Sequence, residues 1–117
     1  MRLRTPPQPV PLTPAVFHIL LALADGEKHG YAIMKQVEAD GAGFLRMGPG
    51  TLYGSLQRMS AAGLVQEIQG SGNERRRLYR LTGTGQRALN AELVRLRTAL
   101  SSARKKGVAS PATADGE

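Results

Sequence analysis

The feature that most constrains the fold is a polar, glycine-rich segment, QGSGNER at residues 69–75, which lies between two short apolar runs. Residues 64–68 and 76–81 have the length and composition of β-strands, and two strands around such a loop form a β-hairpin. Helical patterns precede and follow this hairpin. The sequence therefore predicts a mainly α-helical chain with one small β-hairpin.

Two helices are predicted in the first forty residues. Thr13 and Pro14 start the first one, because threonine caps free amide groups and proline suits the first helical position. Residues 16–23 are apolar nearly all round, which is typical of a helix buried on most sides. A turn at residues 25–28 leads to the second helix, at residues 30–40.

The third and fourth helices lie on either side of the hairpin. The third starts at residues 48–50 and ends before Gly63, and its apolar side chains recur at helical spacing at Leu52, Leu56 and Met59. Thr82 caps the fourth helix, which is predicted for residues 83–106. Four leucines form one stripe along it: Leu89, Leu93, Leu96 and Leu100.

Three helices followed by a hairpin and a further helix give the order of a winged helix-turn-helix. We expect a flexible proline-rich arm at residues 1–11 and a winged-helix domain at residues 12–82. A dimerisation helix at residues 83–106 and a disordered tail at residues 107–117 are expected to follow.

The net charge of +7 is concentrated in one part of the chain. Residues 1–40 are neutral, whereas residues 46–106 carry twelve basic and three acidic side chains. A localised basic surface favours a polyanion, nucleic acid before an acidic membrane, with simple solubility as the alternative. The chain has no cysteine, no apolar run that could span a membrane and no signal peptide, so we expect a cytoplasmic protein, nucleoid-associated when bound to DNA.

The third helix carries the first candidate DNA contacts. Opposite its apolar stripe lie Gly50, Gly54 and Gln57. Two glycines within a helix cost about 1 kcal/mol each relative to alanine, and they make sense where another surface approaches the backbone closely. A DNA major groove is such a surface, in which Gln57 would read adenine and Arg58 guanine. Hydroxyl groups suited to phosphates flank this face on Thr51, Tyr53 and Ser55. The alternative is an ordinary solvent-exposed helix.

A second basic group follows the glycine-rich loop. Because consecutive strand residues point to opposite faces, Arg75 and Arg77 share one face, and Arg76 and Arg80 share the other. A wing that lies along the DNA backbone or enters a minor groove would use arginine in this way. With Arg46, which precedes the third helix, these residues are the predicted phosphate contacts, unless the hairpin is only a solvated charged loop.

The leucine stripe of the fourth helix has little to pack against except the first helix or a second copy of the chain. We therefore predict a homodimer. Its predicted contacts are Phe17 and Leu20 of the first helix and Leu89, Leu93, Leu96 and Leu100 of the fourth.

No catalytic or metal-binding constellation is evident, and neither an enzymatic activity nor a cofactor is predicted. GTGQRA at residues 83–88 matches a dinucleotide-binding fingerprint, but no second parallel strand follows it. Gly85 is instead expected to allow close packing at the start of the helix. His18 is expected to be a satisfied core or interface residue, and His29 to help cap the second helix.

Four segments together resemble the PadR family of transcriptional regulators: LTP at 12–14, HGYAI at 29–33, GPGTLY at 48–53 and RRRLYRLT at 75–82, with Gly85. The resemblance implies a dimeric winged-helix repressor whose C-terminal helix packs against the partner. It places Thr51 and Tyr53 in the DNA-facing helix and residues 75–77 in the wing. Gly54 stands where many members have proline, and Leu78 where an aromatic residue is usual. The single C-terminal helix resembles the short branch of the family, in which small hydrophobic effectors bind at the dimer interface.

These observations predict a sequence-specific regulator that binds double-stranded DNA as a homodimeric repressor on a pseudo-palindromic operator. A small hydrophobic effector at the dimer interface would relieve repression, and no membrane partner is predicted. The alternative is a winged-helix protein-interaction module that dimerises without binding duplex DNA.

Overall fold

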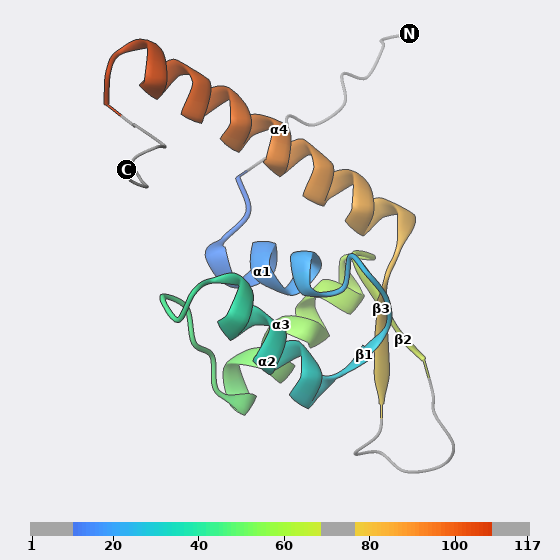
Figure 1. Cartoon of the computed structure of the whole chain (residues 1–117). Helices are drawn as coiled ribbons and strands as arrows, with labels where there is room; N and C mark the ends of the chain where they lie inside the picture. Colours follow the sequence, from blue (N-terminus) through green and yellow to red (C-terminus); the bar gives the residue numbers. More distant parts are fainter. Residues whose placement is uncertain (1–10, 69–76, 109–117) are drawn as a thin grey trace, which may run out of the picture.

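A computed structural model describes residues 11–68 and 77–108. The elements are α1 (Pro14–Ala22), β1 (Lys28–His29), α2 (Gly30–Asp40), α3 (Pro49–Ala61), β2 (Val65–Ile68), β3 (Leu78–Leu81) and α4 (Gly83–Lys105). Helices α1 to α3 gather beside the small sheet, and α4 crosses over α1 and continues past it (Figure 1). This arrangement confirms the predicted winged helix-turn-helix. The predicted arm and tail lie almost wholly outside the described residues.

The predicted helix boundaries are confirmed where short-range chemistry sets them. The Thr13 hydroxyl accepts the Val16 N–H at 3.2 Å, and Pro14 occupies the first turn of α1. Pro49 does the same for α3. Gly63 follows the end of α3 with φ +79°, a left-handed conformation that glycine adopts without steric cost.

The sheet is antiparallel and has the order β1-β3-β2. Val65 pairs with Leu81 and Ile68 with Leu78, so β2 and β3 form the two-stranded part of the predicted wing. The prediction of a turn at residues 25–28, followed directly by the second helix, is wrong at Lys28, because Lys28 and His29 form the short β1. Two residues carry no periodic signal, and β1 forms only because β3 offers its other edge for pairing.

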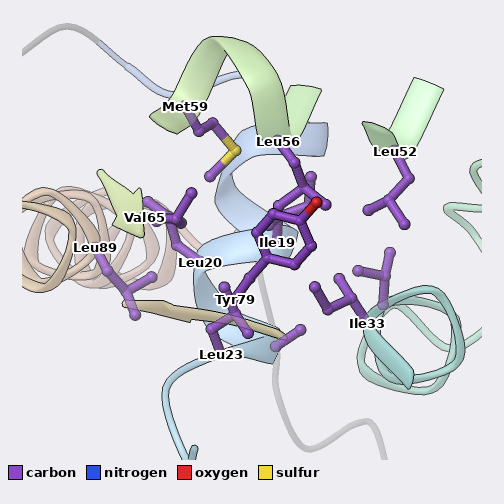
Figure 2. Packing of buried hydrophobic residues seen from close by; sticks show 12 residues of the cluster. Ile19, Leu20, Leu23, Ile33, Leu52, Leu56, Met59, Val65, Tyr79 and Leu89 are labelled. Carbon is purple, nitrogen blue, oxygen red and sulfur yellow. The ribbon is translucent and has the colours of Figure 1, made fainter. Parts of the chain in front are cut away.

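One hydrophobic core joins every helix to the sheet. Ile19 and Leu20 of α1 are fully buried at its centre. Ile19 lies between Ile33 of α2 and the inner face of α3, and Leu20 lies on the side of Val65 and Leu89 (Figure 2). The other large buried side chains around them are Leu23, Val37, Leu52, Leu56, Met59, Val65, Tyr79 and Leu89. Helix α3 contributes three of these, Leu52, Leu56 and Met59, so its inner face packs into the core. The opposite face of α3 is exposed to solvent.

The start of α4 is fixed against the corner between α3 and β2. The Thr82 hydroxyl accepts the Gly85 N–H at 2.9 Å and donates toward the carbonyl groups of Gly63 and Leu64 at 2.6 and 3.0 Å. A Cβ at Gly85 would overlap the Leu64 carbonyl oxygen and lie 3.0 Å from Leu81 Cδ1. The expectation that Gly85 allows close packing is thereby confirmed.

The beginning of the described chain is also tied to α4. The Glu92 carboxylate is buried and accepts the Leu12 N–H at 3.4 Å. It also forms an ion pair with Arg95, whose Nη2 lies 3.1 Å from the same oxygen. A buried carboxylate needs such partners, since burial of an isolated charge is unfavourable. Glu92 therefore joins α4 to the segment that leads into α1.

Candidate nucleic-acid interface

The outward face of α3 carries most of the predicted DNA contacts. Exposed residues on it are Gly50, Thr51, Tyr53, Gln57 and Arg58, and Gly54 is half-buried. A Cβ at Gly50 would have no neighbour within 4 Å, and one at Gly54 would meet only Arg58 Nη1 at 3.5 Å. The packing of this chain therefore does not require either glycine. The absence of side chains at these two positions leaves the helix backbone accessible to an external surface.

Ser55 does not belong to this face, so its predicted phosphate contact is wrong. Its side chain is buried, in line with Leu52, Leu56 and Met59 on the inner side of the helix. The physical reason is helical spacing, because residues three and four apart lie on the same side. The Ser55 hydroxyl instead accepts a weak hydrogen bond from Arg58 Nη2 at 3.4 Å. This bond orients the guanidinium that remains exposed.

The side chain of Tyr53 extends from α3 toward the sheet. Its side chain is 45% exposed, and it lines a surface cavity of about 360 Å³ together with Leu56, Gln57, Ser60, Glu67, Arg77 and Tyr79. Burial raises the pKa of the Tyr79 hydroxyl above the ordinary tyrosine value, and the Glu67 carboxylate adds to the rise. Tyr79 forms part of the inner wall of this cavity. This cavity separates the exposed face of α3 from the wing.

The described part of the wing carries two arginines that pair across the strands. Arg77 Nε lies 3.0 Å from Glu67 Oε2, and both side chains are partly exposed. Arg80 donates two hydrogen bonds to Gln66 Oε1, at 2.9 and 3.1 Å. Arg77 lies on the face that lines the cavity with Tyr79, whereas Arg80 is held on the opposite face of β3. The predicted contacts at positions 75 and 76 lie outside the described residues.

Arg46 precedes α3, as predicted, but it is directed toward α2. Its Nε lies 3.4 Å from Glu38 Oε2, and its side chain remains largely exposed. An exposed ion pair of this kind contributes little to stability and can exchange partners easily. Arg46 can therefore leave Glu38 for a phosphate at small cost.

The two histidines take different places relative to the core. His29 occupies the N-cap position of α2, as predicted, but its side chain makes no capping hydrogen bond, and its Nδ1 lies 3.4 Å from the Arg77 carbonyl oxygen. It therefore joins the start of α2 to the wing strand. His18 is half-buried beside Phe17, and its Nδ1 has no hydrogen-bond partner within the described chain. His18 Nδ1 is therefore not satisfied in the core of the single chain, and the alternative that His18 is an interface residue stays a prediction.

The predicted dimer contacts divide into two sets. Leu93, Leu96 and Leu100 form one apolar stripe on α4, and they are 38%, 46% and 43% exposed in the single chain. Leu20 and Leu89 are instead buried in the core of the single chain, so they cannot form an interface surface. The reason is that α4 crosses α1 near its own start, where these two side chains meet the core. Phe17 is half-buried against the same core.

Other site types find no support in the described residues. Residues 11–68 and 77–108 contain no group of three or more histidine, cysteine, aspartate or glutamate side chains that could hold a metal ion. Among the helices just described, none has both the length and the apolar character needed to cross a membrane.

Residues 19–91 match the Transcriptional regulator PadR-like family. A protein described as an uncharacterized 37.1 kDa protein in transposon TN4556, from Streptomyces fradiae, is 43% identical over 74 residues, which are 63% of this chain and 20% of that protein. Transcriptional regulator Rv3488 of Mycobacterium tuberculosis is 40% identical over 76 residues, which are 64% of this chain and 68% of the relative. The chain thus spans one fifth of the first relative and about two thirds of the second.

The solved structures that are similar to this one include two transcriptional regulators. A transcriptional regulator from Clostridium thermocellum, Cth-833, has a TM-score of 0.66 and 23% identity over 77% of this chain and 89% of its own, and it shows the same fold. Bacillus subtilis PadR, solved in complex with operator DNA, has a TM-score of 0.58 and 27% identity over 68% of this chain and 46% of its own.

The family match begins within α1 and ends within α4, so it includes α2, α3 and the strands of the wing. It therefore covers the elements that form the exposed face of α3 and its flanks. On this match over more than half of its length, the chain belongs to the PadR-like family of transcriptional regulators.

Proposed function

We propose that this chain is a sequence-specific regulator that binds double-stranded DNA and represses as a homodimer on a pseudo-palindromic operator. The observation that carries the proposal is the outward face of α3, where Gln57 and Arg58 lie beside two glycines that no internal packing requires. Such a face suits a major groove, which admits a helix and offers base edges to glutamine and arginine. The solved complex of Bacillus subtilis PadR with operator DNA supports the same use of the fold.

The proposed dimer rests on α4. Helix α4 extends past α1 (Figure 1). Three of its leucines, Leu93, Leu96 and Leu100, are partly exposed and form one stripe. A second copy of the chain would cover this stripe through a two-fold interface. Two recognition helices related in this way would bind half-sites roughly one helical turn of DNA apart. A hydrophobic effector that relieves repression would bind between the paired helices, because their apolar side chains would line its site.

An electrophoretic retardation assay tests the proposal. Duplex DNA from upstream of the chain's own gene is compared with a random duplex of equal length, between about 50 and 200 mM salt. We expect the upstream duplex to bind at least roughly 1,000-fold more tightly. Both affinities should fall steeply as salt rises, because phosphate neutralisation releases counterions. No retardation of either duplex at the lowest salt would favour a protein-interaction module instead.

Gln57→Ala tests the base-reading role of α3. The variant should lose roughly 5- to 150-fold in operator affinity for each half-site, since a bidentate contact with a base contributes about 1–3 kcal/mol of discrimination. Binding to the random duplex should stay unchanged, because Gln57 carries no charge for phosphate. Gln86→Ala, at an exposed position on α4, is the matched control and should change neither affinity. Equal losses on both duplexes would contradict base reading by Gln57.

A further inference from the structure

Gly30 occupies a buried position where the chain leaves the sheet and enters α2. It is the first residue of that helix and directly follows β1. A Cβ at Gly30 would overlap the Tyr53 hydroxyl oxygen and would lie only 2.7 Å from Tyr53 Cζ and 3.0 Å from Cε1. The tyrosine ring therefore rests directly on the Gly30 backbone, in space that any side chain at Gly30 would fill.

Tyr53 connects this contact with the wing. It belongs to the first half of α3, and its side chain also lines the surface cavity. The opposite wall of this cavity contains Glu67 of β2, Arg77 just before β3, and Tyr79 of β3. The Tyr53 ring therefore contacts α2 on one side and faces the wing across the cavity on the other. Its position therefore influences both parts of the proposed DNA-binding surface.

The backbone beside Gly30 is joined to the wing as well. His29 pairs with Leu78 across the β1–β3 ladder, and its Nδ1 lies 3.4 Å from the Arg77 carbonyl oxygen. A continuous set of contacts therefore runs from β3 through His29 and Gly30 to Tyr53. The wing and α3 are linked through it although they are separated along the chain.

We propose that Gly30 is a positioning residue for operator recognition, because the absence of a side chain there seats Tyr53 and fixes α3 relative to the wing. This inference rests on the proposed function. Operator binding requires base contacts from α3 and phosphate contacts from the wing in one register, since phosphate contacts set orientation and base contacts set specificity. Binding to random DNA has no fixed register and depends mainly on charge. Displacement of Tyr53 should therefore reduce specificity more than general affinity.

Gly30→Ala tests this inference through the ratio of operator affinity to random-duplex affinity at one salt concentration. The ratio should fall at least about tenfold, a loss comparable to one mismatched base pair, while random-duplex affinity changes less than about twofold. Gly83→Ala is the matched control, because Gly83 is the first residue of α4 and a Cβ there would lie 3.6 Å from Arg87 Nη1. This control should keep the ratio of the unmodified chain. An unchanged ratio in Gly30→Ala, or equal losses on both duplexes, would overturn the inference.

Substitution of Tyr53 separates positioning from simple stability. In the Tyr53→Leu background the overlap is removed, so Gly30→Ala should cause little further fall in the ratio. If Gly30→Ala alone does not fold, Tyr53→Phe and Tyr53→Leu decide the question. Tyr53→Phe keeps the ring, so loss of its hydroxyl contact with phosphate should lower both affinities alike and keep their ratio, whereas Tyr53→Leu should lower the ratio. A ratio that is equal in these two variants would contradict the positioning role.

A measurement without DNA distinguishes failure of this inference from failure of the proposed function. Amide chemical shifts compare the unmodified chain with Gly30→Ala, or with Tyr53→Leu where the alanine variant does not fold. We expect changes in β3 as well as in α3. Changes confined to α2, or for Tyr53→Leu to α3, would overturn the inference even if the DNA assays succeed. If the unmodified chain has no preference for its upstream DNA, the proposed function fails. The inference about operator recognition then fails as well, even if the amide chemical shifts show that Gly30 is coupled to β3 and α3.

Discussion

Replacing Gly85 with alanine is expected to lower the free energy of unfolding by about 3 kcal/mol, although alanine favours a helix over glycine by about 1 kcal/mol. The added Cβ would overlap the Leu64 carbonyl oxygen and lie 3.0 Å from the carbonyl carbon. That carbonyl cannot move freely, because it accepts the Thr82 N–H at 3.2 Å and the Thr82 hydroxyl at 3.0 Å. Chemical denaturation followed by circular dichroism measures the difference.

Gly83→Ala is the control for this experiment as well. It lies two residues away in the same first turn of α4, where a new methyl group has room beside Arg87. Its stability should be unchanged or slightly higher, because only the helix preference remains. If Gly85→Ala and Gly83→Ala unfold at the same denaturant concentration, the tight junction described at the start of α4 is not a determinant of stability.

The double substitution Leu93→Glu/Leu96→Glu is expected to convert the proposed dimer into folded monomers. Both side chains are partly exposed in the single chain, so their loss removes little internal packing. A two-fold interface would contain each substitution twice, and carboxylates buried there without partners are strongly unfavourable. Operator affinity should fall at least about 100-fold, because two linked half-site contacts bind far more tightly than one.

Thr98→Glu/Ser101→Glu is the matched control for the leucine pair. It adds the same two negative charges at the same spacing, at exposed positions away from the leucine stripe. Sedimentation equilibrium should give a dimer for the control and a single-chain mass for the leucine variant. A leucine variant that stays dimeric and keeps operator affinity would show that the chain does not pair through α4.

The parts of the fold that were predictable from sequence depend on neighbouring residues. Thr13 and Thr82 cap helices through hydroxyl groups three residues from their partners, and Gly63 ends α3 because glycine accepts a positive φ. Each of these signals is complete within a few residues. Together with the apolar spacing they gave the order of the four helices and the hairpin, and therefore the winged helix-turn-helix, but not β1.

The remaining features depend on contacts between distant parts of the chain. Ser55 was assigned to the DNA face because spacing alone does not give the width of a buried face. Leu89 belongs to the same stripe as Leu93, yet it is buried because α4 crosses α1 at that point. The contact between Gly30 and Tyr53 joins two helices and has no local signal. The DNA and dimer contacts themselves stay predictions.

The fixed start of α4 gives that helix the properties of a lever. Its 23 residues form a rod about 35 Å long, and Thr82 and Gly85 attach one end rigidly to the corner beside α3. In a dimer paired through α4, a change of roughly 10° in the crossing angle would move the far end of such a rod by about 6 Å. That displacement approaches two base-pair steps along the DNA. The distance between operator half-sites that the dimer prefers would therefore report the crossing angle of the two α4 helices.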